Sequence, residues 1–182
     1  MNSNGFTSLI YYLLLKVKLK DLVKQGLRLG KNVYIGNDVV IDPAFPWLIS
    51  IGDDCFISAR SIILAHDSST KKHIGYTRVG KVTIGRNTFI GMGSVILPGV
   101  KIGDNSIIGA GSVVTTHVPE DSVAVGNPVV VVGKTSKFAA FHKQKMKCVP
   151  IFEEGWTNET GIDDQRKKLM EESLENSQGY VI

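Results

Sequence analysis

The most constraining feature of this chain is a run of six unbroken six-residue repeats between Ile84 and Pro119. Every repeat begins with Ile or Val, four of the six have Gly in the second position, and the fifth position is always small or branched. A period of six matches neither the roughly 3.6 residues per turn of an α-helix nor the alternation of a single strand, but it fits a coil of short strands and tight corners. The repeats therefore predict an all-β fold, a parallel β-helix in which the first residue of each repeat points inward.

The repeat is also present earlier in the chain, beginning near Ile35 and continuing to Ile63. The next repeat starts at Ile84, 21 residues after Ile63, which is three more than a whole number of repeats. The register therefore breaks, and a polar and basic loop over residues 68–81 must leave the coil. A long loop on a regular scaffold usually carries function, because regular coils alone offer little chemistry.

The repeat divides the chain into three predicted parts. Residues 1–30 include a predicted helix over 5–25, which would cover the open end of the coil stack. Lysines make this helix basic, so a peripheral helix on an anionic membrane is the alternative interpretation. Residues 31–134 form the repeat domain. Residues 135–182 contain a short basic helix over 136–147 and an acidic tail, in which 163–176 favours a helix and the rest is expected to be flexible.

Charge is unevenly distributed along the chain. The formal net charge is +4, but residues 153–182 hold eight acidic and three basic residues, which leaves +9 on the first 152 residues. A basic body favours partners that carry phosphates, such as a cofactor, a nucleotide sugar or an anionic membrane face. Because no recognition motif or interleaving of aromatic and basic residues is present, we expect no nucleic-acid partner.

The cysteines and the apolar segments predict a cytoplasmic protein. Cys55 and Cys148 are the only cysteines, which is no basis for a disulfide framework. Cys55 lies at an inward repeat position and is expected in the core. The longest apolar run, Leu9–Leu15, is shorter than the roughly 18 to 20 residues that span a bilayer and lacks the features of a secretory signal. Peripheral contact with a membrane-linked glycan at the inner membrane face is the further expectation.

Two of the repeats predict a strip of coil surface with almost no side chains. Three repeats make one turn of a three-sided coil, so residues 18 apart stack directly. The stacked residues of this strip are Gly91, Met92, Gly93, Gly109, Ala110 and Gly111. An extended ligand can lie on such a strip against backbone N–H and C=O groups. The alternative is that glycine serves only the geometry of the corners, which accounts well for Gly85 and Gly103.

His66 is the strongest catalytic candidate, because it stands where the regular coil gives way to the loop. Histidine titrates near neutrality and is suited to take a proton from an alcohol. Asp67 follows directly, and we expect its carboxylate to face away from the imidazole. Asp67 and His73, the latter within the loop, are the candidates for contact with substrate. His117 is expected to be structural, and the fourth histidine, at position 142, is expected at the surface.

Several segments of the chain resemble the left-handed β-helix acyltransferases built from hexapeptide repeats. The segments are the repeats themselves, the Ala-His-Asp sequence before the loop, residues 109–115 (GAGSVVT) and residues 123–128 (VAVGNP). They are most similar to the sugar O-acetyltransferase branch, which includes maltose and galactoside acetyltransferases and enzymes that modify capsule or O-antigen sugars. The resemblance covers residues 30–134.

This resemblance implies a left-handed coil and a homotrimer with active sites between subunits. The implied reaction is transfer of an acetyl group from acetyl-CoA to a hydroxyl of a sugar, nucleotide sugar or glycan, in surface polysaccharide biosynthesis. The resemblance also implies that His66 is the general base and that no metal is used. The residues that would line the pantetheine arm of acetyl-CoA are Met92, Gly93, Ala110, Gly111 and Thr115. Many relatives also carry basic residues at two places that Thr116 and Val130 occupy here, so Lys134 or Lys137 would hold the CoA phosphates instead.

Four other functions are alternatives to this one. The nearest is an N-acetyltransferase acting on an amino sugar or a nucleotide-linked amino sugar. A serine acetyltransferase is disfavoured, because residues 1–30 are too short for its helical N-terminal domain. A β-helix carbonic anhydrase is disfavoured by the spacing of His66 and His73, which does not suit a three-histidine zinc site. A non-catalytic scaffold predicts neither the loop nor the histidine at its base.

Overall fold

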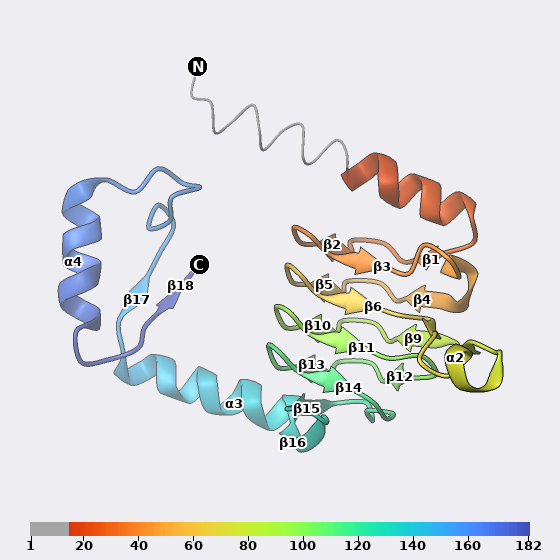
Figure 1. Ribbon diagram of the computed structural model, residues 1–182. Coiled ribbons are helices and arrows are strands. Elements are labelled where there is room, and N and C mark those ends of the chain that lie inside the picture. The colour runs from red at the N-terminus through yellow and green to blue at the C-terminus, as the bar shows by residue number, and fades with distance from the viewer. Residues whose placement is uncertain (1–14) are drawn as a thin grey trace. The chain divides into compact units, whose positions relative to one another are not determined.

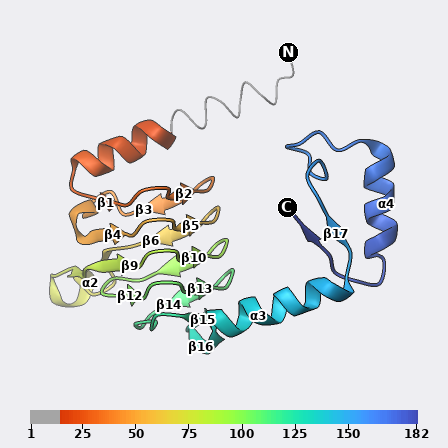
Figure 2. The same cartoon turned by 180° about the vertical axis from the view of Figure 1, so that it is seen from behind.

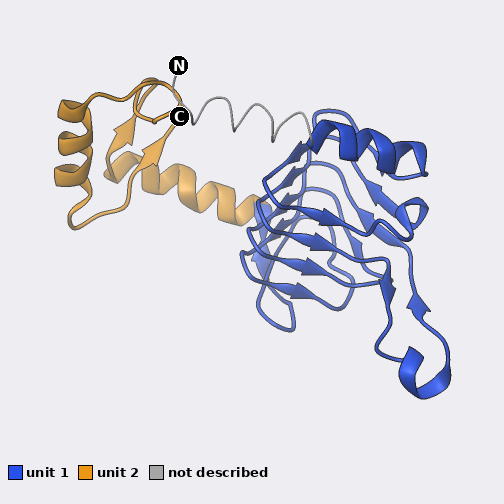
Figure 3. Cartoon of the chain, turned by 45° about the horizontal axis from the view of Figure 1, so that its top comes forward, with its two compact units in different colours: residues 1–135 blue, residues 136–182 orange. Residues whose placement is uncertain are grey.

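A computed structural model describes residues 15–182 of the chain. Residues 5–14 of the predicted N-terminal helix, with most of the apolar run Leu9–Leu15, lie outside the described residues. The chain forms two compact units that divide after Thr135 (Figure 3). Between residues 15 and 182, no helix has the length and apolar character needed to cross a membrane.

The first unit is a β-helix whose sides are three sheets of short strands (Figure 1). The first sheet consists of β1 (Arg28–Leu29), β4 (Ile49–Ile51), β9 (Val82–Ile84) and β12 (Lys101–Ile102). The second consists of β2 (Tyr34–Ile35), β5 (Phe56–Ile57), β10 (Phe89–Ile90), β13 (Ile107–Ile108), β15 (Ser122–Val125) and β16 (Val130–Lys134). The third consists of β3 (Val40–Ile41), β6 (Ile62–Ile63), β11 (Val95–Ile96) and β14 (Val113–Val114). All neighbours in these sheets are parallel except β16, which runs antiparallel to β15 and closes the coil.

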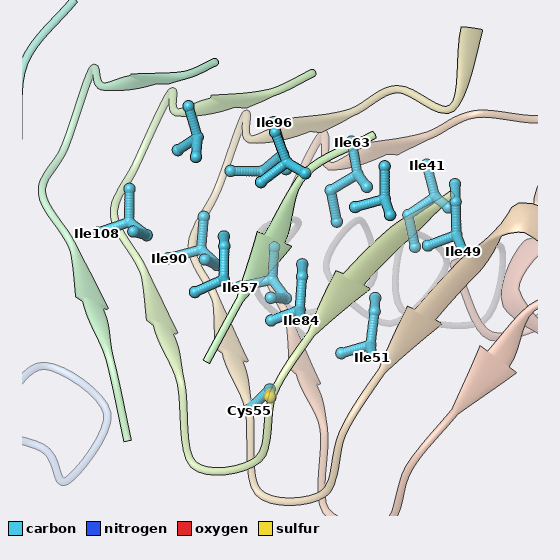
Figure 4. Close-up of a cluster of buried hydrophobic side chains, with 14 of the residues drawn as sticks. Ile41, Ile49, Ile51, Cys55, Ile57, Ile63, Ile84, Ile90, Ile96 and Ile108 are labelled. Carbon is cyan, nitrogen blue, oxygen red and sulfur yellow. The ribbon is translucent and has the colours of Figure 1, made fainter. Parts of the chain in front are cut away.

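The first position of each repeat forms the core, as the sequence predicts. Ile90 pairs with Ile57 on one side and Ile108 on the other, and the isoleucines form stacked columns inside the coil (Figure 4). Each first-position side chain from Ile84 to Val114 is at most 1% exposed. Burial of one such side chain stabilises the fold by about 1.5–3 kcal/mol, so repetition of the pattern stabilises every coil against its neighbours. The predicted β-helix is thereby confirmed.

The corner between the first and second sheets explains another part of the repeat. A column of Asn and Asp residues occupies its left-handed backbone conformation: Asn32, Asp54, Asn87, Asn105 and Asp121. Asn87 Nδ2 donates to Asn105 Oδ1 at 2.8 Å, so these side chains also bond between coils. A Cβ at Gly103 would lie 2.3 Å from the Glu120 amide nitrogen. Glycine is therefore needed at Gly103 for the close approach of two coils, as predicted.

Two further elements belong to this unit. Residues 15–24 are helical, and Leu22 of this helix is buried against the core cluster. The predicted loop is a hairpin of β7 (His66–Asp67) and β8 (Arg78–Val79), with the short helix α2 (Lys71–Ile74) between them. Cys55 is buried as expected, and this burial raises the pKa of its thiol.

The second unit corrects the expectation of a largely flexible tail. It contains α3 (Thr135–Lys145), a 3-10 turn (Met146–Cys148), β17 (Ile151–Phe152), α4 (Asp164–Leu174) and β18 (Tyr180–Val181), and Figure 2 shows these elements from behind. Strands β17 and β18 pair in parallel, and Phe152 is buried at 6% exposure. His142, expected at the surface, is partly buried and hydrogen-bonds the Tyr180 hydroxyl at 2.6 Å. Contacts between distant residues, which local pattern does not reveal, order this segment.

Candidate active site

His66 lies at the corner between the third and first sheets, where the chain leaves the coil. Two residues separate it from β6, and it begins the hairpin strand β7. Its backbone is held at the scaffold, while its side chain is 30% exposed. The Phe45 ring packs beside the imidazole, with 5.3 Å between the ring centroids. The residue thus combines a fixed position with access to solvent, as a general base requires.

Asp42, which follows β3, positions the imidazole. Its carboxylate is fully buried, and Oδ2 lies 2.5 Å from His66 Nδ1. The same oxygen accepts hydrogen bonds from the backbone amides of His66 at 3.1 Å and Ala65 at 2.9 Å. Oδ1 accepts from the Ala44 amide at 3.0 Å. Four donors therefore converge on one buried carboxylate.

The charge of Asp42 determines which ring nitrogen of His66 is protonated. Burial alone would raise the pKa of this carboxyl, but the hydrogen bonds from His66, Ala44 and Ala65 outweigh burial and hold the pKa below its usual range. An ionised carboxylate can only accept hydrogen bonds, so Nδ1 carries the hydrogen. Nε2 is then the basic nitrogen, and among residues 15–182 no group hydrogen-bonds it. A histidine held in this way can accept a proton on Nε2.

Asp42 is not among the site residues predicted from the sequence. The available signal was a carboxylate directly after the inward Ile41, where the stacked coils have Leu64, Leu97 and Thr115. Asp67, the nearest acid in sequence, faces away from the imidazole as predicted. It accepts from the Ser69 amide and from Arg78 across the hairpin, both at 2.9 Å. These bonds, led by the one from Ser69, lower the pKa of the Asp67 carboxyl.

The glycine strip lies at a different corner, between the second and third sheets. Its coils are linked by backbone hydrogen bonds, such as the 2.8 Å bond that the Gly111 amide donates to the Met92 carbonyl. A Cβ at Gly93 or Gly111 would meet no atom within 4 Å, so both positions face open space. A Cβ at Gly91 would instead lie 2.4 Å from the Ala110 amide nitrogen. Packing therefore requires Gly91, while Gly93 and Gly111, both at φ 68°, leave a bare surface.

The structure brings together four of the six residues predicted to bind cofactor: Met92, Gly93, Ala110 and Gly111. Thr115 follows β14 and lies at the corner between the third and first sheets. Lys134 pairs with Ser122, at the end of β16 far from the strip. His73 is exposed in α2 of the hairpin. His117 accepts a hydrogen bond on Nδ1 from the Lys101 amide at 3.1 Å, which agrees with its predicted structural role.

Comparison with known proteins identifies the family. Residues 81–116 match the model of the bacterial transferase hexapeptide (six repeats), and residues 48–65 match that of the hexapeptide repeat of succinyl-transferase. Protein CapG of Staphylococcus aureus is 40% identical over 127 residues, which cover 64% of this chain and 73% of CapG. The chain belongs to the bacterial hexapeptide-repeat transferases. YvoF of Bacillus subtilis is 37% identical over 106 residues, which cover 58% of this chain and 59% of YvoF, less than two thirds of that relative.

Solved hexapeptide-repeat transferases have the same left-handed coil. A maltose O-acetyltransferase from Clostridium difficile superposes with a TM-score of 0.52 at 29% identity, over 63% of this chain and 73% of that one. The polySia specific acetyltransferase NeuO superposes with a TM-score of 0.50 at 26% identity, over 64% of this chain and 62% of that one. The expected left-handed β-helix is confirmed for this hexapeptide-repeat transferase.

Proposed function

We propose that this hexapeptide-repeat transferase moves an acetyl group from acetyl-CoA to a hydroxyl of a sugar, with His66 as the general base. The observation that carries the proposal is the bond between the buried Asp42 carboxylate and His66 Nδ1, at the point where the hairpin leaves the coil. Family membership supports transfer chemistry, and the two solved relatives named above are acetyltransferases by title.

The geometry of the pair suits both halves of the reaction. Nε2 of His66 removes the hydroxyl proton as the acceptor oxygen attacks the thioester carbonyl carbon. The tetrahedral intermediate then collapses, the carbon–sulfur bond breaks, and the imidazolium returns the proton to the departing thiolate. Asp42 holds the ring orientation and stabilises the positive charge that the imidazole gains. A positioned base of this kind contributes about 10²- to 10⁴-fold in rate.

The glycine strip is the proposed site of the acetyl-CoA arm. Gly93 and Gly111 face open space, and Met92 beside them is 49% exposed. A thin pantetheine chain can lie there against backbone groups without displacing side chains. That Lys134 or Lys137 holds the CoA phosphates remains a prediction from the sequence. Lys134 is at the end of β16 that pairs with Ser122.

The separation of base and strip favours a homotrimer. Within one subunit, His66 and Gly93 lie at different corners of the prism, with the third sheet between them. We propose three prisms standing side by side with parallel axes, so that the strip of one subunit faces His66 of the next. Symmetric closure of this kind repeats the same site three times. The hairpin, with exposed Ile74 and Tyr76, would complete the acceptor side with Asp67 and His73.

The acceptor class is part of the proposal. Maltose and polySia in the titles of the two solved relatives support a sugar acceptor. The proposal also includes a role in surface polysaccharide biosynthesis. The enzyme would act in the cytoplasm, at the inner membrane face where the glycan is membrane-linked.

A thiol-release assay with acetyl-CoA and a panel of sugars, nucleotide sugars and amino sugars tests this function. We expect a sugar hydroxyl to stimulate release, and we expect His66→Ala to lose more than 99% of the stimulated rate while remaining folded. The matched control is His142→Ala in the second unit, which should keep the wild-type rate. A requirement for an amine would assign N-acetylation instead, and near wild-type turnover by His66→Ala would exclude its role as base. Sedimentation equilibrium measures the trimer.

A further inference from the structure

Arg60 stands out among the corner residues of the coil. Its φ is +59°, in the left-handed region, where a residue with a long side chain is disfavoured. Every other residue between 15 and 182 with positive φ is Gly, Asn or Asp. Arg60 occupies the fourth position of its repeat, which holds Gly93 and Gly111 in the following coils. The backbone conformation alone therefore does not explain an arginine at this corner.

Asp38 occupies the same corner one coil before Arg60, and the Arg60 side chain lies beside the strip. Its Nη2 lies 4.0 Å from the Met92 sulfur. Within the described residues, no carboxylate oxygen lies within 4 Å of its guanidinium, whereas Arg78 and Arg86 each pair with an aspartate, at 2.9 and 2.8 Å. A guanidinium next to an open surface is suited to bind an oxyanion, because its planar fork can donate two parallel hydrogen bonds.

The position of Arg60 along the coil indicates which substrate it faces. The Arg60 amide donates to the Asn37 carbonyl at 2.8 Å, the Gly93 amide to the Ala59 carbonyl at 3.0 Å and the Gly111 amide to the Met92 carbonyl. Asp38, Arg60, Gly93 and Gly111 therefore form one column, with Asp38 on the side of Arg60 away from the two glycines. Arg60 and His66 flank the same strand, β6, and therefore belong to the same coil. In a trimer with parallel axes, Arg60 of one subunit is then level with His66 of the next. The thioester must also lie at this level, so the rest of the donor extends past Gly93 and Gly111, away from Arg60.

We propose that Arg60 binds an anionic group of the acceptor, a carboxylate or a phosphate. The acceptor is then an acidic sugar or a phosphorylated sugar rather than a neutral one. This inference rests on the proposed function and deepens it, because it assigns the substrate class and the residue that selects it. In the proposed trimer the donor phosphates lie away from Arg60, because a donor with its phosphates at Arg60 would place its thioester two coils away from His66.

The test compares neutral and acidic acceptors of matched shape: galactose against galacturonate, and N-acetylglucosamine against its 1-phosphate. We expect wild-type kcat/KM to favour the anionic member of at least one pair by 10-fold or more. Arg60→Asn should lower kcat/KM for that member by about 10- to 100-fold, the usual effect of a lost charge-assisted hydrogen bond. The neutral member should change less than threefold. Asparagine adopts positive φ readily, so the melting temperature should be maintained.

Arg28→Gln is the matched control, since Arg28 is an exposed arginine on the first sheet, away from the strip. It should leave both acceptor classes unchanged, which separates a local effect from a loss of net charge. The galactose and galacturonate pair tests for a carboxylate on the acceptor, and the N-acetylglucosamine and 1-phosphate pair tests for a phosphate.

Three outcomes would overturn the inference while the proposed function stands: a wild-type preference for neutral sugars, an equal loss on both members in Arg60→Asn, or a rise in KM for acetyl-CoA alone. The last would assign Arg60 to the donor. If wild-type enzyme releases no thiol with any of the four sugars or with the wider panel, the proposed function fails, and this inference fails with it.

Discussion

Replacement of Asp42 by asparagine removes one charge and almost no volume from the site. Three donors converge on Oδ2, two of them from His66 and one from Ala65, whereas only the Ala44 amide reaches Oδ1. The side-chain carbonyl of asparagine should therefore take the place of Oδ2, and its NH₂ group should face the Ala44 amide. His66 Nδ1 keeps an acceptor, so the variant tests the charge of Asp42 more than the tautomer of His66.

The expected loss of rate follows from the charge that the imidazole gains in the reaction. Two unit charges about 4 Å apart interact by about 4 kcal/mol at an effective dielectric constant of about 20. The His66 side chain is 30% exposed, so solvent screens part of this energy, and about 2–4 kcal/mol is a reasonable range. Because about 1.4 kcal/mol corresponds to a tenfold change, kcat should fall by about 30- to 1,000-fold. The unpaired Ala44 amide should lower the free energy of unfolding by about 1–3 kcal/mol.

Initial rates of thiol release, measured with the best acceptor of the panel, test this prediction. Asp104→Asn is the control, because Asp104 is also an aspartate with a lowered pKa that bonds a backbone amide and a cation, both from Arg86. It lies at the corner between the first and second sheets, away from His66, and its kcat should change less than threefold. A folded Asp42→Asn enzyme with wild-type kcat would refute the role of the carboxylate, and so would an equal loss in Asp104→Asn.

Three further predictions follow from the described geometry. The pKa of Asp42 is lowered from its ordinary 3.8, so its ionisation stabilises the fold above that pH, and this stability is lost as pH falls through the lowered pKa. Below about pH 4 the melting temperature should therefore fall more steeply with pH for wild type than for Asp42→Asn, and parallel curves would contradict this. Gly111→Asn should raise KM for acetyl-CoA at least about 10-fold with little change in melting temperature. Gly103→Ala should instead lower the free energy of unfolding by about 1–3 kcal/mol, because its Cβ would meet the neighbouring coil; a loss of stability in Gly111→Asn and a raised KM in Gly103→Ala would contradict the bare strip. Deletion of residues 69–80 should raise KM for the acceptor more than KM for acetyl-CoA in steady-state assays, and an equal effect on both would contradict the assignment of the hairpin.

The β-helix was predictable because its core is a local pattern repeated many times. Ile84, Ile90 and Ile96 each show the same inward position within six residues of the next, so each coil supplies independent evidence for the same fold. The second unit offered no such repetition. Its order depends on pairings such as His142 with Tyr180, 38 residues apart, and no short window of sequence contains both partners.

The site was predictable only in part for the same reason. His66 stands at a visible break in the repeat, so the sequence placed it at the edge of the scaffold. Asp42 is 24 residues earlier, and only the pairing of β3 with β6 in the third sheet brings the two together. The distance along the chain therefore concealed the partner of His66, while the nearer Asp67 bonds Arg78.

The residues argued to carry chemistry all occupy repeat positions that hold another residue type in most coils. Asp42 stands in the second position, where glycine is common, and Arg60 and His66 stand in the fourth, where Gly, Asn and Asp prevail. The coils are joined mainly by backbone hydrogen bonds and by inward isoleucines, neither of which depends on the side chain at these corners. Corner positions can therefore change without loss of the fold, provided that no Cβ meets the next coil. In this chain the corner that accepts Arg60 and the corner that holds His66 flank a single strand, β6, so one coil of the stack carries both the proposed base and the proposed anion contact.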